Sequence, residues 1–386
     1  MEDLMWKGMK VIDADAHMHE PESLWDKYVE SQFHDQVPKV AFMDGIIMVY
    51  EPDGYIIPKG DLQPRPSPGV YKTLEEKYGE AYRQWWSPEI RLSDMDQFGW
   101  DIQVCLPTGN NGNFAYRVAL KDIKLGAAMC RAYNNWCADY CGVDAKRLKF
   151  TAVLPGGDVG EMVTEARRAV EDLGAVSIRN PLLPTGQWLH SPVNDPLWAL
   201  ACDLDFPISV HGEYRQRRFQ PFAGIKYDPS AGALEALDHA LGFPCDNMTT
   251  MGHFIFAGML ERFPELRLAI LESNAGWLPF WLGRMDEHAH GRNSMFFNAE
   301  KLPMTPSDYV SRQCYIACDG DERALRYVVD YMEGENLVWN TDYPHPDAPN
   351  PLEALPDLDS QDISDEAKRK ILWDNSVTLY GRRLVA

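Results

Sequence analysis

The segment VIDADAHMHEP, residues 11–21, begins as an apolar strand and ends in a run of ionisable side chains. Four of these occupy alternate positions: Asp13, Asp15, His17 and His19. Because the side chains of a strand alternate between its two faces, we expect all four to point the same way. Burying four ionisable groups on one face of an apolar strand is costly unless a cation lies among them. The segment therefore predicts a metal site at the carboxyl end of a first strand.

Two later segments, ISVHGEY (208–214) and NTDYPHPD (340–347), also place ionisable residues directly after short apolar runs. Taken alone, His211 is typical of a structural histidine, and Asp342 is typical of a residue that caps the next helix. If both segments are strands of one parallel barrel, their carboxyl ends meet the end of the first strand. The sequence then predicts that His211 and Asp342 join the site at residues 13–19.

Eight short runs rich in β-branched and aromatic residues are candidate strands, and most are followed by a helical pattern. The candidate strands are Lys10–Glu20, Trp100–Thr108, Leu148–Gly156, Ala175–Leu182, Phe206–Glu213, Leu266–Ser273, Gln313–Gly320 and Asn336–Pro344. The candidate helices are Gly160–Leu173, Pro192–Leu204, Asp321–Met332 and Asp365–Leu379. Repeated strand–helix alternation predicts an α/β fold, a (β/α)₈ TIM barrel in which residues 1–386 form a single domain.

Residues from about 38 to 90 interrupt this alternation after the first strand. Their first part contains two Asp-Gly pairs, at 44–45 and 53–54, and ends in the Pro-rich stretch Pro64–Pro68. An Asp-Gly pair between apolar runs is typical of a hairpin. We expect a small β insertion that covers the mouth of the barrel. The alternative is a structural flap without a catalytic role.

The composition of the 386 residues excludes some classes of function and location. A balance of 37 basic against 58 acidic residues gives a net charge of −21, which argues against a nucleic-acid-binding surface. No run approaches the roughly 20 apolar residues of a membrane span, and residues 1–10 lack the apolar core of a signal peptide. The eight cysteines form no CxxC pair, so we expect reduced thiols and a cytoplasmic location. Twelve tryptophans and several apolar runs suggest a homo-oligomer, a dimer or larger.

The chain resembles the amidohydrolase superfamily, in the branch that contains metal-dependent decarboxylases and hydratases. The resemblance covers nearly the whole chain and depends on the order and spacing of five segments. These are DADAHMHEP (13–21), RLSDMDQFGWDIQVCLPT (91–108), RAYNNWCADYC (131–141), LERFPELRLAILESNAGWLPFWLGRMDEH (260–288) and VWNTDYPHPD (338–347). It implies one divalent metal ion and a small-molecule substrate.

The resemblance also implies the ligands of that metal ion. By position they are Asp15 and His17 from the first strand, His211 from the fifth and Asp342 from the eighth. A competing alignment makes His17 and His19 the ligands, but the spacing from His17 to Pro21 favours the first. Imidazole and carboxylate donors without a thiolate suit Zn²⁺, Mn²⁺ or Fe²⁺ and do not distinguish among them.

The end of the sixth strand departs from the family pattern. Relatives with decarboxylase or hydratase activity usually have a histidine there, whereas this chain has Glu272, Ser273 and Asn274. The role of that histidine passes either to Glu272 or to His253 of the preceding helix. The alternatives without a catalytic role are that Glu272 is a structural carboxylate paired with Arg179 or Arg284, and that His253 packs its helix.

Four further residues are candidates for contact with the substrate. Arg179, at the end of the fourth strand, and Arg215, after the fifth, carry guanidinium groups that suit a substrate carboxylate. Trp277 is a candidate for an apolar wall of the pocket, and His19 is placed with this group if it does not bind metal.

The leading hypothesis is a metal-dependent carboxy-lyase for a small carboxylated, aromatic or cyclic substrate. In that reaction the metal would chelate the substrate carboxylate and a neighbouring hydroxyl, and Asp342 would deliver a proton to the ring carbon as carbon dioxide departs. The first alternative is a hydrolase in which a metal-activated water, deprotonated by Asp342, cleaves a C–N or C–C bond. The second alternative is a catalytically silent, metal-dependent binding protein.

Overall fold

We analysed a computed structural model of residues 1–386. The structure describes residues 6–21, 23–37, 39–43, 46–50, 56–57, 68–107, 115–116, 118–184, 186–212, 234–291 and 302–386. Side chains at 39–43, 46–50, 56–57, 68–72, 234–235 and 238 lie outside this description, and only the backbone is considered there.

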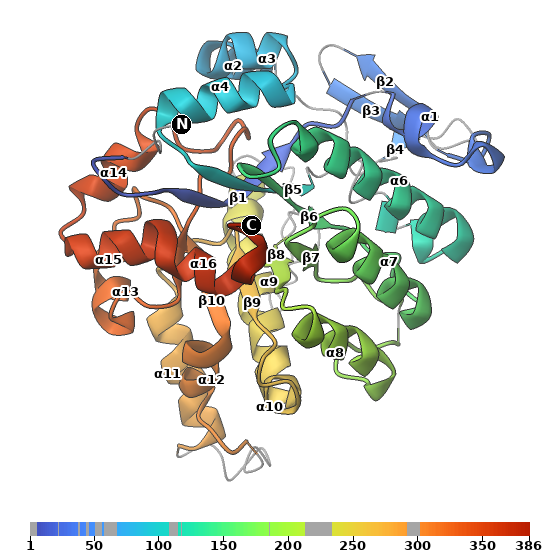
Figure 1. The fold of residues 1–386 in the computed structure, drawn as a ribbon. Coiled ribbons are helices and arrows are strands. Elements are labelled where there is room, and N and C mark those ends of the chain that lie inside the picture. The colour runs from blue at the N-terminus through green and yellow to red at the C-terminus, as the bar shows by residue number, and fades with distance from the viewer. Residues whose placement is uncertain are drawn as a thin grey trace.

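Eight parallel strands form one sheet that curves into a barrel (Figure 1). In sheet order they are β1 (Ile12–Met18), β5 (Ile102–Pro107), β6 (Leu148–Ala152), β7 (Ser177–Arg179), β8 (Ile208–His211), β9 (Leu268–Leu271), β10 (Cys314–Cys318) and β11 (Leu337–Trp339). Each lies inside one of the eight ranges that the sequence predicts, so the (β/α)₈ prediction is confirmed.

Two backbone hydrogen bonds join the first strand to the segment that follows the last. The His17 N–H donates to the Tyr343 carbonyl at 2.7 Å, and the Asp342 N–H donates to the Asp15 carbonyl at 2.9 Å. These bonds close the barrel at its carboxyl end. They also place three residues predicted as metal ligands within one hydrogen-bonded strip.

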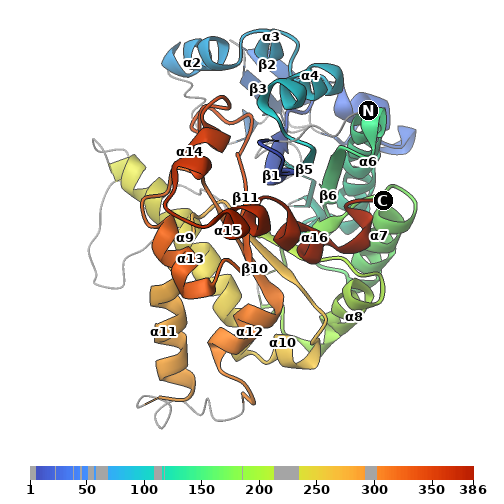
Figure 2. The ribbon, with the colours of Figure 1, turned by 60° about the vertical axis from the view of Figure 1, so that its left-hand side comes forward.

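Helices surround the barrel, as Figures 1 and 2 show. The α-helices are α1 (Leu24–Tyr28), α2 (Pro68–Tyr78), α3 (Glu80–Arg83), α4 (Pro88–Phe98), α6 (Ile123–Cys141), α7 (Val159–Glu171), α8 (Asp195–Asp203), α9 (Leu234–Phe256), α10 (Met259–Arg262), α11 (Leu278–Ala289), α12 (Pro306–Gln313), α13 (Leu325–Met332), α14 (Ala354–Ser360), α15 (Asp365–Arg369) and α16 (Asn375–Tyr380). Short 3₁₀ helices cover Ser31–Phe33, Gly142–Asp144, Pro192–Asn194 and Gly381–Arg383, and a π-helix covers Lys370–Asp374.

The predicted helices differ from the observed ones mainly at their starts. The range Pro192–Leu204 begins with a 3₁₀ turn, and Ser191 makes no capping hydrogen bond there. Helix α7 begins instead at a capped position, because the Asp158 side chain accepts from the Glu161 N–H.

The core has two parts, one inside the barrel and one between the barrel and its helices. The smaller, inner part contains Ile12 and Ala14 of β1 together with apolar residues of β5, β9, β10, β11 and α16. The larger, outer part contains Val11 and Met18 of the same strand, packed against the helix layer. The inner apolar layer ends where the ionisable residues at the carboxyl end of the barrel begin.

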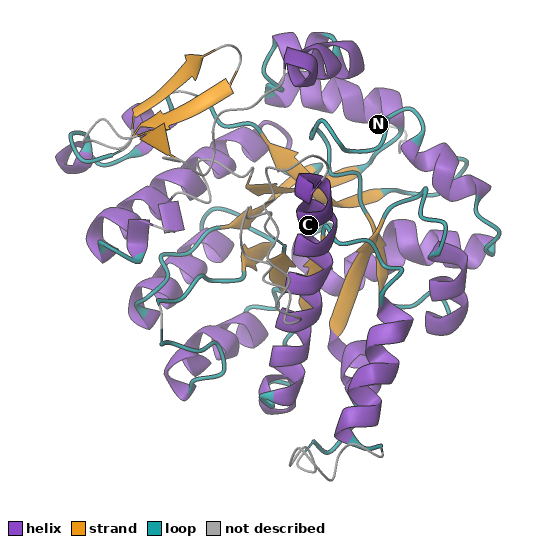
Figure 3. Ribbon diagram, turned by 180° about the vertical axis from the view of Figure 1, so that it is seen from behind, coloured by secondary structure: helices purple, strands orange, loops and turns teal. Residues whose placement is uncertain are grey.

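The insertion after β1 contains the predicted β structure. Strands β2 (Lys39–Met43), β3 (Ile46–Tyr50) and β4 (Ile56–Ile57) form an antiparallel sheet, followed by α2 and α3. In Figures 1 and 3, which view the molecule from opposite sides, this sheet lies at the edge of the molecule, to one side of the barrel. Residues 58–67 lie outside the described residues, and a cover over the barrel mouth stays a prediction.

Two further expectations from composition can be compared with the structure. None of the described helices has both the length and the apolar character needed to cross a bilayer. All eight cysteines are free thiols, and six of them are buried.

Candidate metal centre

The first strand contains a bulge between its two aspartates. Asp13 pairs with Gln103 of β5 and Ala16 pairs with Cys105, so β1 has one residue more than β5 between these two pairs. Because one extra residue turns the following side chains to the other face, Asp13 and Asp15 do not point the same way. The expectation that all four ionisable residues of this strand share a face is therefore wrong for Asp13.

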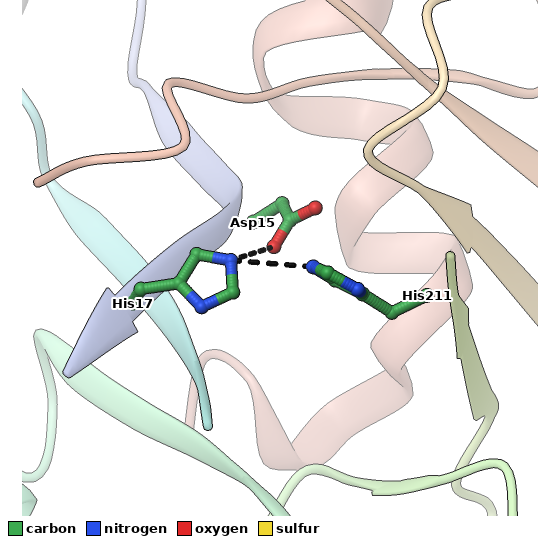
Figure 4. Close-up of side chains that lie close together, drawn as sticks. All are labelled: Asp15, His17 and His211. Atoms are coloured by element: carbon green, nitrogen blue, oxygen red, sulfur yellow. Dashed lines mark hydrogen bonds and ion pairs between the residues drawn. The ribbon is translucent and has the colours of Figure 1, made fainter. Parts of the chain in front are cut away.

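The imidazole of His17 lies at the centre of a cluster formed by three strand ends. Its Nε2 atom is 3.4 Å from Asp15 Oδ1, 3.3 Å from His211 Nε2 and 3.2 Å from Asp342 Oδ1. Figure 4 shows one ring nitrogen of His17 facing both the Asp15 carboxylate and the His211 ring. The structure thus brings together the four residues that the resemblance names as ligands, from β1, β8 and the end of β11.

The orientation of these side chains fits a divalent cation. The second ring nitrogens of the two histidines face backbone carbonyls, His17 Nδ1 at 3.2 Å from Pro107 O and His211 Nδ1 at 2.6 Å from Gly212 O. A proton on each Nδ1 leaves the Nε2 lone pair free for a metal. Both carboxylate oxygens of Asp15 are buried without a hydrogen-bond partner.

The distances between the donor atoms also fit a single divalent cation. Two ligands of one ion lie about 3.0–3.4 Å apart when the metal–ligand bonds are about 2.0–2.2 Å long. The three separations measured from His17 Nε2 fall at the upper end of that range. An orphaned buried carboxylate beside two imidazoles is costly without a positive charge among them, and a metal ion supplies that charge.

The pKa values of the two histidines shift in opposite directions. Burial alone would lower the pKa of His17, but Asp15 and Asp342 outweigh it and raise that pKa well above its ordinary value. Burial lowers the pKa of His211 to about 4, with Asp15 opposing and Arg179 adding to the shift. These shifts favour the protonated form of His17 and the neutral form of His211.

His345 belongs to this cluster, although the sequence analysis did not single it out. Its Nδ1 lies 2.8 Å from Asp342 Oδ1, and its ring stacks on that of His17 with 4.1 Å between centroids. Burial would raise the pKa of Asp342, but His345 and His17 outweigh it and hold that pKa below its ordinary value. Its position three residues after Asp342, in the quoted segment 338–347, was the signal that could have found it.

Glu272 lies directly after β9, at the end of the sixth barrel strand. Its Oε2 is 2.6 Å from His211 Nε2, so it lies against the cluster of predicted ligands, and its catalytic role stays a prediction. Burial, together with the negative charge of Asp342, raises the pKa of Glu272 well above its ordinary value. This shift favours the protonated form of Glu272.

The backbone is strained where two of these carboxylates attach. Glu272 and Asp342 have φ angles of +51° and +55°, in the left-handed region that non-glycine residues rarely adopt. Asn274, close to Glu272, has a φ angle of +55°. Strained conformations of this kind gather at functional sites, because the surrounding structure must be organised to hold them.

A cavity of about 230 Å³ opens beside the cluster. Glu272, Asp342 and Asp319 form its polar side, and Phe243 and Pro244 of α9 contribute apolar surface. For comparison, an apolar cavity of about 150 Å³ is large enough to bind benzene. The described lining therefore offers an aromatic ring an apolar contact next to two carboxyl groups.

Arg179 lies on the other side of His211, at the end of β7. It is buried, lies 5.6 Å from the ring of Tyr116, and lines a smaller polar cavity together with His211 and Asn247. This position agrees with the expected contact to a substrate carboxylate, which stays a prediction.

His19 follows β1 and stacks on Trp86, with 4.4 Å between ring centroids. Its Nε2 is buried without a hydrogen-bond partner, and burial lowers its pKa well below the ordinary value. Among the residues described, Asp15, His17 and His211 lie close enough together to hold a metal ion, and His19 is not part of that group.

Two candidates from the sequence, His253 and Trp277, do not join the cluster, and a third cannot be placed. His253 lies in the last turn of α9, ten residues beyond Phe243, where its Nε2 is 3.0 Å from His190 Nδ1. Ten helical residues span about 15 Å, which takes His253 away from the site. Trp277 packs against the outer core and donates to the Ser273 carbonyl at 3.0 Å. Arg215 lies outside the described residues.

Comparison with known proteins is consistent with this geometry. A family model described as amidohydrolase matches residues 12–382. The chain is 23% identical over 301 residues to a 2-amino-3-carboxymuconate-6-semialdehyde decarboxylase of Dictyostelium discoideum, covering 77% of each chain.

Two solved structures share the fold over nearly their full lengths. An amidohydrolase from Mycobacterium avium subsp. paratuberculosis K-10 has a TM-score of 0.73 and 19% identity, covering 97% of this chain and 99% of that one. A 5-carboxyvanillate decarboxylase from Novosphingobium aromaticivorans has a TM-score of 0.69 and 20% identity, covering 98% and 99%. That structure contains manganese and 4-hydroxy-3-methoxy-5-nitrobenzoic acid.

Proposed function

The chain belongs to the amidohydrolase family, and from this premise we propose that it is a metal-dependent carboxy-lyase acting on a hydroxy-substituted aromatic acid. Asp15, His17, His211 and Asp342 are the proposed ligands of one divalent ion. The manganese in the 5-carboxyvanillate decarboxylase favours Mn²⁺, and Zn²⁺ remains compatible with the same donor atoms. The similarity in sequence to the Dictyostelium discoideum decarboxylase supports the same class of reaction.

The cavity beside Asp342 is the observation on which this proposal depends most. Phe243 and Pro244 offer apolar contact to a ring, while Asp342 and Glu272 face the same space. Replacing a carboxylate on a ring by hydrogen requires a proton donor within reach of that carbon, and these two residues provide one.

The proton has a defined route in this arrangement. The charge of Asp342 favours the protonated form of His345 and raises its pKa above the ordinary value, although burial acts in the opposite direction. Because His345 Nδ1 lies 2.8 Å from Asp342 Oδ1, a proton stored on His345 can pass to Asp342 and then to the ring carbon. A bound metal ion supplies positive charge that holds the substrate carboxylate. In this proposal Arg179, which lines a cavity together with His211, holds a second anionic group of the substrate.

Turnover in ¹⁸O-water separates this reaction from hydrolysis. A panel of hydroxybenzoates, 5-carboxyvanillate, cyclic amides and diketones is incubated with metal-loaded protein. The proposal expects carbon dioxide release and no ¹⁸O in the organic product, because decarboxylation consumes no water. An ¹⁸O-labelled new carboxylate without carbon dioxide would identify a hydrolase, and no turnover with tight ligand binding would favour a binding protein.

Three expectations from the sequence remain proposals. They are a single domain over residues 1–386, a homo-oligomer and a cytoplasmic location. Phe280 of α11 and Tyr327 of α13 are exposed aromatic residues of the kind found at subunit contacts. Light scattering on the purified protein measures the oligomeric state directly, and a monomer at micromolar concentration would contradict the expectation.

A further inference from the structure

Asp13 is a fully buried carboxylate that does not point into the metal cluster. Its Oδ2 accepts a hydrogen bond from Thr341 Oγ1 at 2.6 Å and another from Gln103 Nε2 at 2.9 Å. Its Oδ1 accepts from the Thr341 N–H at 3.0 Å and, more weakly, from the Asp15 N–H at 3.3 Å. One carboxylate therefore ties together β1, β5 and the segment that follows β11.

Gln103 connects Asp13 to a second buried charge. Arg91 of α4 is fully buried, and its Nη1 donates to Gln103 Oε1 at 3.0 Å. Arg91 also donates to the hydroxyl of Tyr140 at 2.9 Å and to the carbonyl of His17. Among the described residues Arg91 forms no ion pair, so the Gln103 amide lies between the guanidinium and the Asp13 carboxylate with both of its ends bonded.

A network of this kind is costly to bury, and an apolar core could fill the same volume. Buried charges are favourable only where every polar atom is satisfied, and they then fix a geometry more tightly than apolar packing does. The atoms that this network fixes all adjoin proposed ligands. They are the carbonyl of His17, the N–H of Asp15, and the N–H of Thr341, which directly precedes Asp342.

We propose that Asp13 is a positioning residue for the metal centre: through Thr341 and Gln103 it sets the separation between His17 and Asp342 and thereby the affinity for the divalent ion. The left-handed conformation of Asp342 makes such a support necessary, because its backbone would otherwise relax away from that region. Removing an outer partner of a metal ligand typically costs 10–100-fold in affinity or activity. This inference rests on the metal site of the proposed function but not on the reaction.

Substitutions of Thr341 test the inference without removing a charge. T341V preserves the shape of the side chain but loses the hydroxyl that donates to Asp13 and accepts from the Tyr343 N–H, whereas T341S keeps it. The affinity for Mn²⁺ is measured by competition with a chromophoric chelator, and the visible spectrum of bound Co²⁺ reports the ligand geometry. We expect T341V to bind Mn²⁺ about 10–100-fold more weakly and to alter the Co²⁺ spectrum. T341S should stay within about threefold of the wild type.

A matched control separates positioning from general stability. Glu165 of α7 is also a buried carboxylate, bonded to Asn134 at 2.6 Å and to Arg168 at 2.7 Å, but it touches none of the proposed ligands. E165Q should lower the unfolding temperature and leave both Mn²⁺ affinity and the Co²⁺ spectrum unchanged. The direct variant D13N leaves the Thr341 hydroxyl and its bond from the Tyr343 N–H in place, so a D13N protein with the same weakened Mn²⁺ binding as T341V assigns the effect to Asp13.

The inference is overturned if T341V lowers the unfolding temperature as E165Q does but binds Mn²⁺ with wild-type affinity and gives a wild-type Co²⁺ spectrum. Asp13 would then only stabilise the barrel. A wild-type protein that binds Mn²⁺ but decarboxylates nothing would contradict the proposed function and leave this inference standing, because neither readout depends on turnover.

Discussion

The variant D342N separates proton transfer by Asp342 from its role as a metal ligand. Asparagine retains an oxygen for the metal but cannot take up and release a proton near neutral pH. It also tolerates the left-handed conformation at this position, where φ is +55°, so the variant should fold. The proton path from His345 Nδ1 across 2.8 Å to Asp342 Oδ1 is then interrupted.

The expected loss follows from that interruption. Proton transfer by a positioned side chain contributes about 10²–10⁴-fold to a rate, so turnover should fall at least about 100-fold, or about 2.7 kcal/mol in activation free energy. Turnover is followed as carbon dioxide release at saturating Mn²⁺, because the neutral amide should also bind the ion more weakly. The metal content of each sample is measured beside the rate.

D347N is the matched control for this experiment. Asp347 lines the same cavity, but its side chain is largely exposed and pairs with His239 at 3.7 Å rather than with the cluster. Its substitution should change turnover less than about threefold. If metal-loaded D342N keeps more than a tenth of the wild-type rate, Asp342 acts as a ligand only. E272Q would then be the variant that abolishes turnover.

Three further predictions concern metal binding and stability. H211A should hold far less than one divalent ion per chain by elemental analysis, since it removes one of about four ligands; full occupancy would exclude His211 as a ligand. The affinity for Mn²⁺ should rise with pH through neutrality, because the raised pKa of His17 means that a proton must leave before the ion binds; calorimetry in buffers of different ionisation enthalpy should detect about one proton released per ion. Burial raises the pKa of Asp319 to about 7, so the metal-free folded state binds this proton more tightly than the unfolded chain and loses stability as pH rises from about 4 to 7. D319N should remove part of that loss in thermal unfolding scans, and an unchanged pH profile would show that Asp319 titrates elsewhere.

The convergence of the site could be predicted from the sequence because it depends on topology. His17, His211 and Asp342 lie far apart in the chain, but each lies at or just after the carboxyl end of a barrel strand. Parallel strands of one barrel end at the same face, so eight strand ranges were enough to bring these residues together.

The bulge in β1 could not be predicted in the same way. Strict alternation requires that no residue be inserted, and nothing in IDADAHM marks the extra residue between Asp13 and Ala16. The consequence is large, because the bulge turns Asp13 away from Asp15, the proposed ligand two residues later. His345 was missed for a related reason. It follows the strand end in an irregular segment, where neither the two-residue period of a strand nor the 3.6-residue period of a helix applies.

His253 shows the limit of judging proximity along the chain. It lies in the helix before the sixth strand, whereas the family histidine follows that strand. Its helix α9, however, runs from Leu234 to Phe256, and His253 is in the last turn, beyond the part that lines the cavity. Glu272 reaches the cluster because it follows a strand rather than a helix.

The most direct test of the account is turnover in D₂O with the hydroxybenzoate that the ¹⁸O panel identifies. Metal-loaded wild-type protein should release carbon dioxide and yield a product with one deuterium on the carbon that carried the carboxylate, as NMR detects. Chelator-treated protein should yield neither until Mn²⁺ is restored. Full turnover without metal, or a product without deuterium at that carbon, would contradict a metal-dependent decarboxylase at this site.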